Sequence, residues 1–222
     1  MRLFGIDVGR AETGYCAYDI EKKEIVLSET IALPIAKMRS RTNNINPSAY
    51  RLTKFKEVFM EDIFKARVGF ESNSFAMIED YAYGDQSITL DDFRKMDKMS
   101  LEVAEMHGVV YETLADLKIP YYKIPPSQLK CFVTGNGRCE KADMIKALHE
   151  EYKCDLNTHH EYDALGCIHV LRFLIAYVKN PSVFHDGTYE KMVCTQLSYD
   201  AKYSGVTALI RKITSEPLKI DF

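Results

Sequence analysis

The sequence lacks the long apolar run that a membrane-spanning helix requires. Its longest apolar stretch, residues 164–178, contains His169 and Arg172 and falls short of the ~20 residues needed to cross a bilayer. A helix in a protein core is the better interpretation of this stretch. The first residues, MRLFGID, already follow a strand pattern and contain no signal-peptide core or cleavage site. We therefore expect a cytoplasmic protein, of a cell or of an infected host cell, with no membrane partner.

The sequence also lacks paired cysteines, internal repeats and low-complexity linkers. Its six cysteines, at positions 16, 131, 139, 154, 167 and 194, form no CxxC pair and no spacing typical of a disulfide-rich domain. This pattern indicates reduced thiols and argues against a structural zinc site. The length of 222 residues and the apolar fraction of 46% allow one large core or two small ones.

An excess of positive charge is missing from the chain as a whole but present in one stretch. The net charge of −3 argues weakly against nucleic-acid binding. Residues 37–56, however, contain six basic side chains and no acidic one. Such a stretch is typical of phosphate contacts, although a solvated loop and helix face explain it equally well. Arg39 and Arg41 are our candidates for DNA contacts within it.

Hydrophobic periodicity predicts a mixed sheet covered by helices. Three strands are expected first, at 2–8, 13–20 and 24–33, with the polar turn EKKE between the second and the third. Gly108 is a potential interruption of the longest expected helix. The remaining pattern predicts strands at 75–83 and 119–126 and helices at 46–67, 90–117, 126–135, 138–154 and 159–178. This order indicates the α/β class, with a mixed five-stranded sheet, a hairpin at one edge and helices on both faces.

Three of these elements bring a carboxylate toward one edge of the sheet. Asp7 closes the first strand and Glu79 lies near the end of the fourth, and sites in α/β sheets gather at the carboxyl ends of strands. Asp163 lies near the start of the last helix, where it shares a helical face with His160 and Cys167. Unpaired carboxylates repel one another, and Mg²⁺ or Mn²⁺ would relieve that repulsion. Two such ions about 4 Å apart are a known device for hydrolysing phosphodiesters.

The last helix begins with a second acid, Glu161. We interpret Glu161 as an ordinary capping acid, because the helix dipole favours a negative charge there and Asn157 or Thr158 can cap the helix. Asp163 differs because it is followed by the small residues of ALGC, which let a helix pack close to a sheet.

Four segments, in this order, resemble the motifs of the RuvC-like Holliday-junction resolvases, members of the RNase H-like nuclease superfamily. GIDVGRAETGY is similar to the opening G-I-D-P-G-x-x-x-T-G motif, with Val8 where proline is usual. MIEDYAYG resembles the I-E segment of the fourth strand, and LKCFVTGNGRCEKADM resembles the V-K and G-x-G-x-x-x-K stretch. HHEYDALGCIH resembles the final acidic helix. The resemblance covers residues 1 to about 178 and implies an RNase H-like fold.

The resemblance implies a metal-dependent DNA endonuclease with four catalytic residues. In this sequence they are Asp7, Glu79, His160 and Asp163, which would hold two Mg²⁺ ions, with Mn²⁺ as a substitute. His159 is the alternative to His160, which we favour because of its spacing from Asp163. The implied reaction is paired nicking of four-way (Holliday) junctions, and of other branched DNA, to leave 5′-phosphate and 3′-hydroxyl ends.

The resemblance also implies DNA contacts and a homodimer. Lys130 and Lys141 match basic positions of the family, although surface lysines would look the same. Tyr83, or its neighbour Tyr81, matches an aromatic side chain that stacks near the scissile step. The helix at 90–117 corresponds to the dimer interface, which suits the near two-fold symmetry of a four-way junction. Its expected seam consists of Met96, Met99, Leu101, Val103, Met106 and Val110, although core packing alone would explain the same pattern.

Two regions depart from the family pattern. Residues 181–222 match no motif, so we expect a nuclease domain at 1–180 and a C-terminal extension of unknown role at 181–222. The basic stretch at 37–51 is longer than expected, and both departures are typical of a viral or phage relative with activity on forks and flaps. The alternatives are a broader RNase H-like or transposase-type nuclease, an actin-like or sugar-kinase-like phosphotransferase, and a junction-binding module without catalysis. The phosphotransferase requires a second D-x-G phosphate loop, which the sequence does not contain.

Overall fold

Five strands form one mixed sheet in the computed structural model, which describes residues 1–33, 47–80, 98–180 and Ser182. The strands are β1 (Arg2–Val8), β2 (Glu12–Asp19), β3 (Glu24–Ala32), β4 (Ser74–Glu79) and β5 (Tyr121–Ile124). Their order across the sheet is β3-β2-β1-β4-β5. β2 pairs antiparallel with β1 and β3, whereas β4 pairs parallel with β1 and β5. The predicted α/β class and mixed five-stranded sheet are therefore confirmed.

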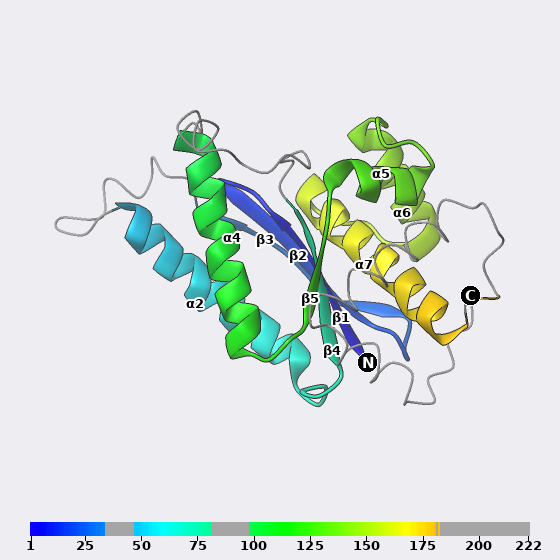
Figure 1. Ribbon diagram of the computed structural model, residues 1–222, viewed down its shortest axis with the longest axis horizontal. Coiled ribbons are helices and arrows are strands. Elements are labelled where there is room, and N and C mark those ends of the chain that lie inside the picture. Colours follow the sequence, from blue (N-terminus) through cyan, green and yellow to red (C-terminus); the bar gives the residue numbers. More distant parts are fainter. Residues whose placement is uncertain (34–46, 81–97, 181, 183–222) are drawn as a thin grey trace.

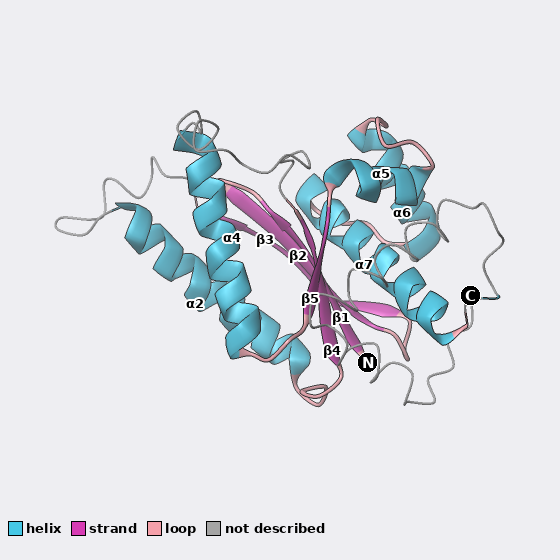
Figure 2. Cartoon of the chain, in the orientation of Figure 1, coloured by secondary structure: helices cyan, strands magenta, loops and turns pink. Residues whose placement is uncertain are grey.

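The described helices cover both faces of this sheet. They are α2 (Pro47–Arg67), α4 (Lys98–Asp116), α5 (Pro126–Thr134), α6 (Lys141–Tyr152) and α7 (His159–Lys179). α2 and α4 lie on one face, and α5, α6 and α7 lie on the other, as Figures 1 and 2 show. None of the described helices is both long enough and apolar enough to cross a membrane.

Alternating side chains along β1 divide the apolar residues between two cores. Phe4 and Ile6 lie in the core beneath α2 and α4, together with Phe59 and Val110. Leu3 lies in the other core, beneath α7. Successive side chains of a strand point to opposite faces, so the odd-numbered residues of β1 face α7. This alternation decides which face the last polar residue of β1 occupies.

Helix α4 is shorter than predicted within the described residues but continuous. It begins at Lys98, and the predicted first turns at 90–97 lie outside the described residues. Gly108 does not interrupt it. The other described elements begin and end within three residues of their predicted bounds, except β4, which ends at Glu79 and not at residue 83. Residues 81–83 lie outside the described part of the chain.

The expected dimer seam along α4 requires a correction. Met106 and Val110 are buried against the sheet in the core that α4 shares with α2. They therefore cannot form an outer surface for a second copy of the chain. Leu101 is exposed and Val103 is half-buried, so these two remain available. The side chains of the other two seam residues, Met96 and Met99, lie outside the described part of the structure.

Candidate active site at the carboxyl ends of β1 and β4

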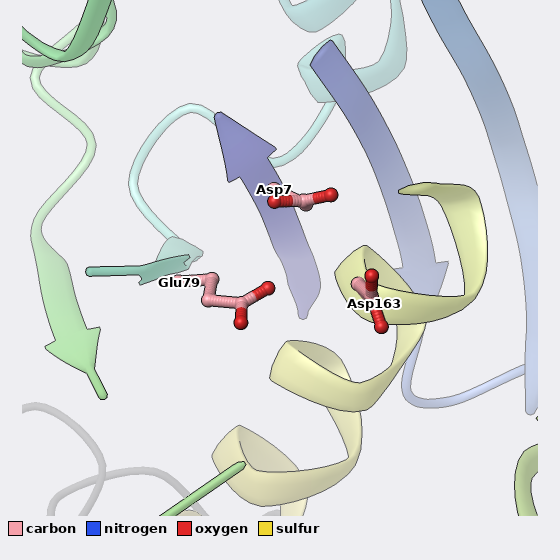
Figure 3. A group of neighbouring side chains, drawn as sticks. All are labelled: Asp7, Glu79 and Asp163. Carbon is pink, nitrogen blue, oxygen red and sulfur yellow. The ribbon is translucent and has the colours of Figure 1, made fainter. Parts of the chain in front are cut away.

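Three carboxylates from distant parts of the sequence meet where β1 and β4 end. Asp7 and Glu79 are direct partners in the parallel register of these strands. Asp163 comes from the start of α7, which packs on the same face of the sheet. Carboxylate oxygens of the three residues lie within 4.8 Å of one another. Figure 3 shows the three side chains gathered between the ends of the strands and the first turns of the helix.

Helix α7 reaches this edge because two strand residues have no side chain. A Cβ atom on Gly5 would lie 1.8 Å from the carbonyl oxygen of Ala164. A Cβ atom on Gly14 would lie 2.3 Å from the carbonyl carbon of His160. Both clashes involve backbone atoms, so no change of rotamer could relieve them. Gly5 and Gly14, the first and last residues of GIDVGRAETG, thus allow the helix to bring Asp163 close to Asp7.

Burial and mutual repulsion make this site unfavourable for three charged carboxylates. Burial, reinforced by the negative charges of Asp7 and Asp163, raises the pKa of Glu79 well above its usual range. Burial and the charge of Asp7 also raise the pKa of Asp163. A group of oxygen ligands that resists full ionisation is stabilised by a bound cation, and hard divalent ions prefer such ligands. The donor chemistry of the site therefore fits a divalent metal.

His160 contacts the metal-ligand candidates from one side. Its Nδ1 atom lies 2.6 Å from Oδ2 of Asp7, and its Nε2 atom lies 3.4 Å from Oε2 of Glu12. The hydrogen bond to Asp7 raises the pKa of His160. His159 is exposed, and its ring centre lies 4.0 Å from that of His160. Of the two candidate histidines, His160 is therefore the one that the structure places against Asp7.

Glu12 is a site residue that sequence reasoning missed. It is the first residue of β2, and the antiparallel register sets its neighbour Thr13 opposite Val8. A carboxylate directly before the Thr-Gly pair could have been placed near the strand end from this hairpin geometry. Its contact with His160, however, depends on how α7 crosses the sheet, which periodicity does not predict.

The capping acid of α7 has the role that the sequence predicted. The Thr158 hydroxyl caps the helix by accepting a hydrogen bond from the backbone N–H of Glu161. The buried Glu161 carboxylate accepts hydrogen bonds from the hydroxyls of Ser28, at 2.7 Å, and Thr30, at 3.1 Å. The backbone N–H of Asn157 also donates to it. Glu161 therefore ties α7 to β3 and is separate from the three clustered carboxylates.

The two predicted lysines occupy different environments. Lys141 is the first residue of α6, and its Nζ atom lies 3.3 Å from Oδ2 of Asp163. Its side chain is half exposed, so it borders the carboxylates and solvent at once. Lys130 lies on α5 and donates a hydrogen bond to the backbone carbonyl of Cys139 at 3.3 Å. The structure thus brings Lys141, but not Lys130, into contact with the carboxylate group. The other predicted DNA contacts, Tyr83, Arg39 and Arg41, lie outside the described residues.

Comparison with known proteins identifies relatives of this chain. It is 29% identical over 152 residues to the crossover junction endodeoxyribonuclease RuvC of Prochlorococcus marinus strain NATL2A, covering 68% of this chain and 83% of that protein. It is 26% identical over 151 residues to the protein of the same name from Synechococcus sp. strain CC9605, covering 68% of this chain and 83% of that protein. No family model matches the sequence.

Solved structures show the same fold. The RuvC structure of Thermus thermophilus superimposes with a TM-score of 0.54 at 19% identity, covering 75% of this chain and 90% of that one. A second structure of that protein, in complex with a Holliday junction substrate, gives a TM-score of 0.53 at 16% identity with the same coverage. These superpositions support the RNase H-like arrangement that the motifs implied.

Proposed function

We propose that this chain, which is similar to RuvC proteins in sequence and in fold, is a metal-dependent endonuclease that resolves four-way DNA junctions. The observation that carries the proposal is the convergence of Asp7, Glu79 and Asp163 within 4.8 Å. Relatives named crossover junction endodeoxyribonuclease support the reaction type, and the junction complex of a protein with this fold supports the substrate class.

We propose that the three carboxylates, with His160 assisting, hold two Mg²⁺ ions, for which Mn²⁺ can substitute. When bound, such ions activate a water molecule and stabilise the leaving oxygen during phosphodiester hydrolysis. Asp7 is the central residue of the set, because it faces Glu79 across the strands and also accepts a hydrogen bond from His160. His160 orients the Asp7 carboxylate, and hydrolysis would leave 5′-phosphate and 3′-hydroxyl ends.

DNA would approach the site from the side of Lys141, whose side chain is half exposed. Lys141 supplies a cation beside Asp163 that is within reach of solvent and suits a phosphate. Lys130, Tyr83, Arg39 and Arg41 remain our other proposed DNA contacts. We also propose that residues 1–180 form the nuclease domain, that residues 181–222 extend it, and that two copies act together because paired nicks require two sites.

The proposal is tested by cleavage of several DNA substrates in parallel. Four-way junction, replication fork, flap, RNA–DNA hybrid and linear duplex, each end-labelled, are incubated with the protein and Mg²⁺ and separated on a denaturing gel. We expect paired symmetric nicks in the junction and intact duplex. Comparable cutting of forks and flaps would identify a general debranching nuclease, and failure to cut with either Mg²⁺ or Mn²⁺ would contradict the proposal.

The variant Asp7→Asn separates cleavage from binding. Loss of the Asp7 charge weakens the metal site while leaving Lys141 and the other basic side chains unchanged. We expect cleavage to fall at least about 100-fold, with junction binding retained or tightened. The matched control is Asp155→Asn, because Asp155 is exposed outside this site. Cutting by Asp7→Asn at the wild-type rate would rule out this assignment of the active site.

A further inference from the structure

A buried histidine reaches the end of β4 from the face opposite the carboxylates. His107 lies on α4 and is only 5% exposed. Its Nε2 atom lies 3.3 Å from the backbone carbonyl oxygen of Glu79, and its Nδ1 atom lies 3.2 Å from that of Val103. The ring packs edge-on against Tyr111, with ring centres 5.7 Å apart. The imidazole therefore connects α4 directly to the last residue of β4.

The two carbonyl groups lie on different elements. Val103 is four residues before His107, so its carbonyl oxygen belongs to the same helix and is also the acceptor for the helical backbone N–H of His107. Glu79 is the last residue of β4 and lies opposite Asp7 of β1. A neutral imidazole has one N–H to donate. With hydrogen on Nε2, that bond joins α4 to the strand end, whereas with hydrogen on Nδ1 it stays within α4, and we assign the Nε2 tautomer to His107.

A bond at this point acts on the carboxylate through the backbone. The Glu79 side chain faces α7, where the negative charges of Asp7 and Asp163 repel its carboxylate. Its backbone carbonyl oxygen contacts His107 of α4 on the opposite face of the sheet. We propose that His107 is a positioning residue, which fixes the end of β4 so that the Glu79 carboxylate keeps its place among the metal ligands. This inference rests on the proposed function.

Three substitutions separate the two nitrogen atoms of the ring. The amide nitrogen of His107→Gln can reach the position of Nε2, whereas that of His107→Asn reaches only the position of Nδ1. His107→Leu removes both ring nitrogen atoms. Outer hydrogen-bond partners of metal ligands typically change metal affinity by 10–100-fold. We therefore expect the Mn²⁺ dissociation constant to rise about tenfold for the Asn and Leu variants and to stay within about threefold of wild type for the Gln variant.

A matched control removes a polar group from the same helix. Thr113 is buried on α4, and its hydroxyl donates a hydrogen bond to the carbonyl of Val109, four residues before it. Thr113→Val should lower the melting temperature without changing Mn²⁺ affinity. Binding is measured by isothermal titration calorimetry on the full chain, at a temperature where circular dichroism shows every variant folded. The half-saturating Mg²⁺ concentration for junction cleavage is measured in parallel.

The outcomes distinguish this inference from the proposed function. Equal Mn²⁺ affinity for the Asn and Gln variants would overturn the role of His107, and this comparison holds even if His107→Leu does not fold. A wild-type protein that binds Mn²⁺ but does not cut junctions would overturn only the proposed function. A wild-type protein that binds no Mn²⁺ would overturn the metal site and the role of His107 together.

Discussion

Glu79 is the residue at which stability and function oppose each other most directly. Its folded-state pKa is raised by burial and by two neighbouring carboxylates, whereas in the unfolded chain it would have a pKa near 4.3. Stability due to the protonated carboxyl is therefore fully present below that unfolded pKa. It is lost as the pH rises through the raised folded value. Near neutral pH, the clustered carboxylates therefore lower the free energy of unfolding of the metal-free protein.

We predict that Glu79→Gln stabilises the metal-free protein at pH 7 while abolishing cleavage. The neutral amide does not ionise, so its stability does not fall as the pH rises. We expect the free energy of unfolding at pH 7 to exceed that of wild type by about 1–3 kcal/mol, since each pKa unit of difference corresponds to about 1.4 kcal/mol. The gain should vanish near pH 4. Urea denaturation with a metal chelator at both pH values measures it, with the exposed Glu150→Gln as control.

Addition of Mg²⁺ should reverse this order. A ligand that binds only the folded state stabilises it in proportion to the logarithm of its concentration over the dissociation constant. Wild type should therefore gain stability with Mg²⁺, and Glu79→Gln should gain little. An equal shift of the denaturation midpoint in both proteins would show that Glu79 is not part of the metal site.

Single residues could be predicted from the sequence where a strand end or a helix turn determines their position. Asp7, Glu79 and Asp163 follow from the order of the elements and from the rule that sites gather at carboxyl ends of strands. Contacts between side chains on elements distant in sequence, such as those of His160 with Glu12 and of His107 with the Glu79 carbonyl, could not. These contacts depend on where one helix crosses the sheet.

At the scale of elements, the close packing of α7 against β1 and β2 determines whether the three carboxylates meet. The helix approaches so closely that a Cβ on Gly14 would overlap the backbone of His160. Periodicity identified α7 and its apolar face but not the closeness of this contact. Similarly, periodicity placed Met106 and Val110 on one face of α4, but it could not say whether the sheet or a second copy covers that face.

We predict opposite effects for two glycine-to-alanine substitutions. Gly14→Ala forces α7 away from the sheet, and we expect a loss of about 1–3 kcal/mol in unfolding free energy together with weaker Mn²⁺ binding. For Gly108→Ala, in the middle of α4, no atom of the described residues outside the neighbouring helix backbone lies within 4 Å of the added Cβ, and we expect a gain of about 0.5–1 kcal/mol. Thermal denaturation and calorimetry measure both. If Gly14→Ala were as stable as wild type and bound Mn²⁺ with the same affinity, the close contact between α7 and β2 would be contradicted.

At the scale of the whole molecule, the proposed function requires an acidic protein to bind a polyanion. The net charge is −3, and three carboxylates face the side where DNA would enter. In the metal-free state they repel phosphates, and the half-exposed Lys141 is engaged with Asp163. A bound divalent ion is the largest local charge in such a site and changes the sign of its interaction with phosphate.

We predict that a divalent ion strengthens junction binding apart from any cutting. At fixed ionic strength, Ca²⁺ should tighten binding to a fluorescently labelled junction by roughly tenfold over a metal-chelated sample. Fluorescence anisotropy measures the two dissociation constants. The Asp7→Asn variant should respond less to Ca²⁺, because its site already has one negative charge fewer. An affinity that is the same with and without Ca²⁺ would contradict this electrostatic account.

The direct pairing of Asp7 with Glu79 also limits how this chain can change in length. Because neighbouring strand residues alternate between faces, deletion of one residue within β1 would turn Asp7 into the core beneath α2 and α4. The same deletion would place Val8 where the carboxylate had been. Insertions and deletions that preserve activity should therefore accumulate in the connections between elements, because one residue more or fewer within β1 or β4 reverses the face that each following side chain occupies.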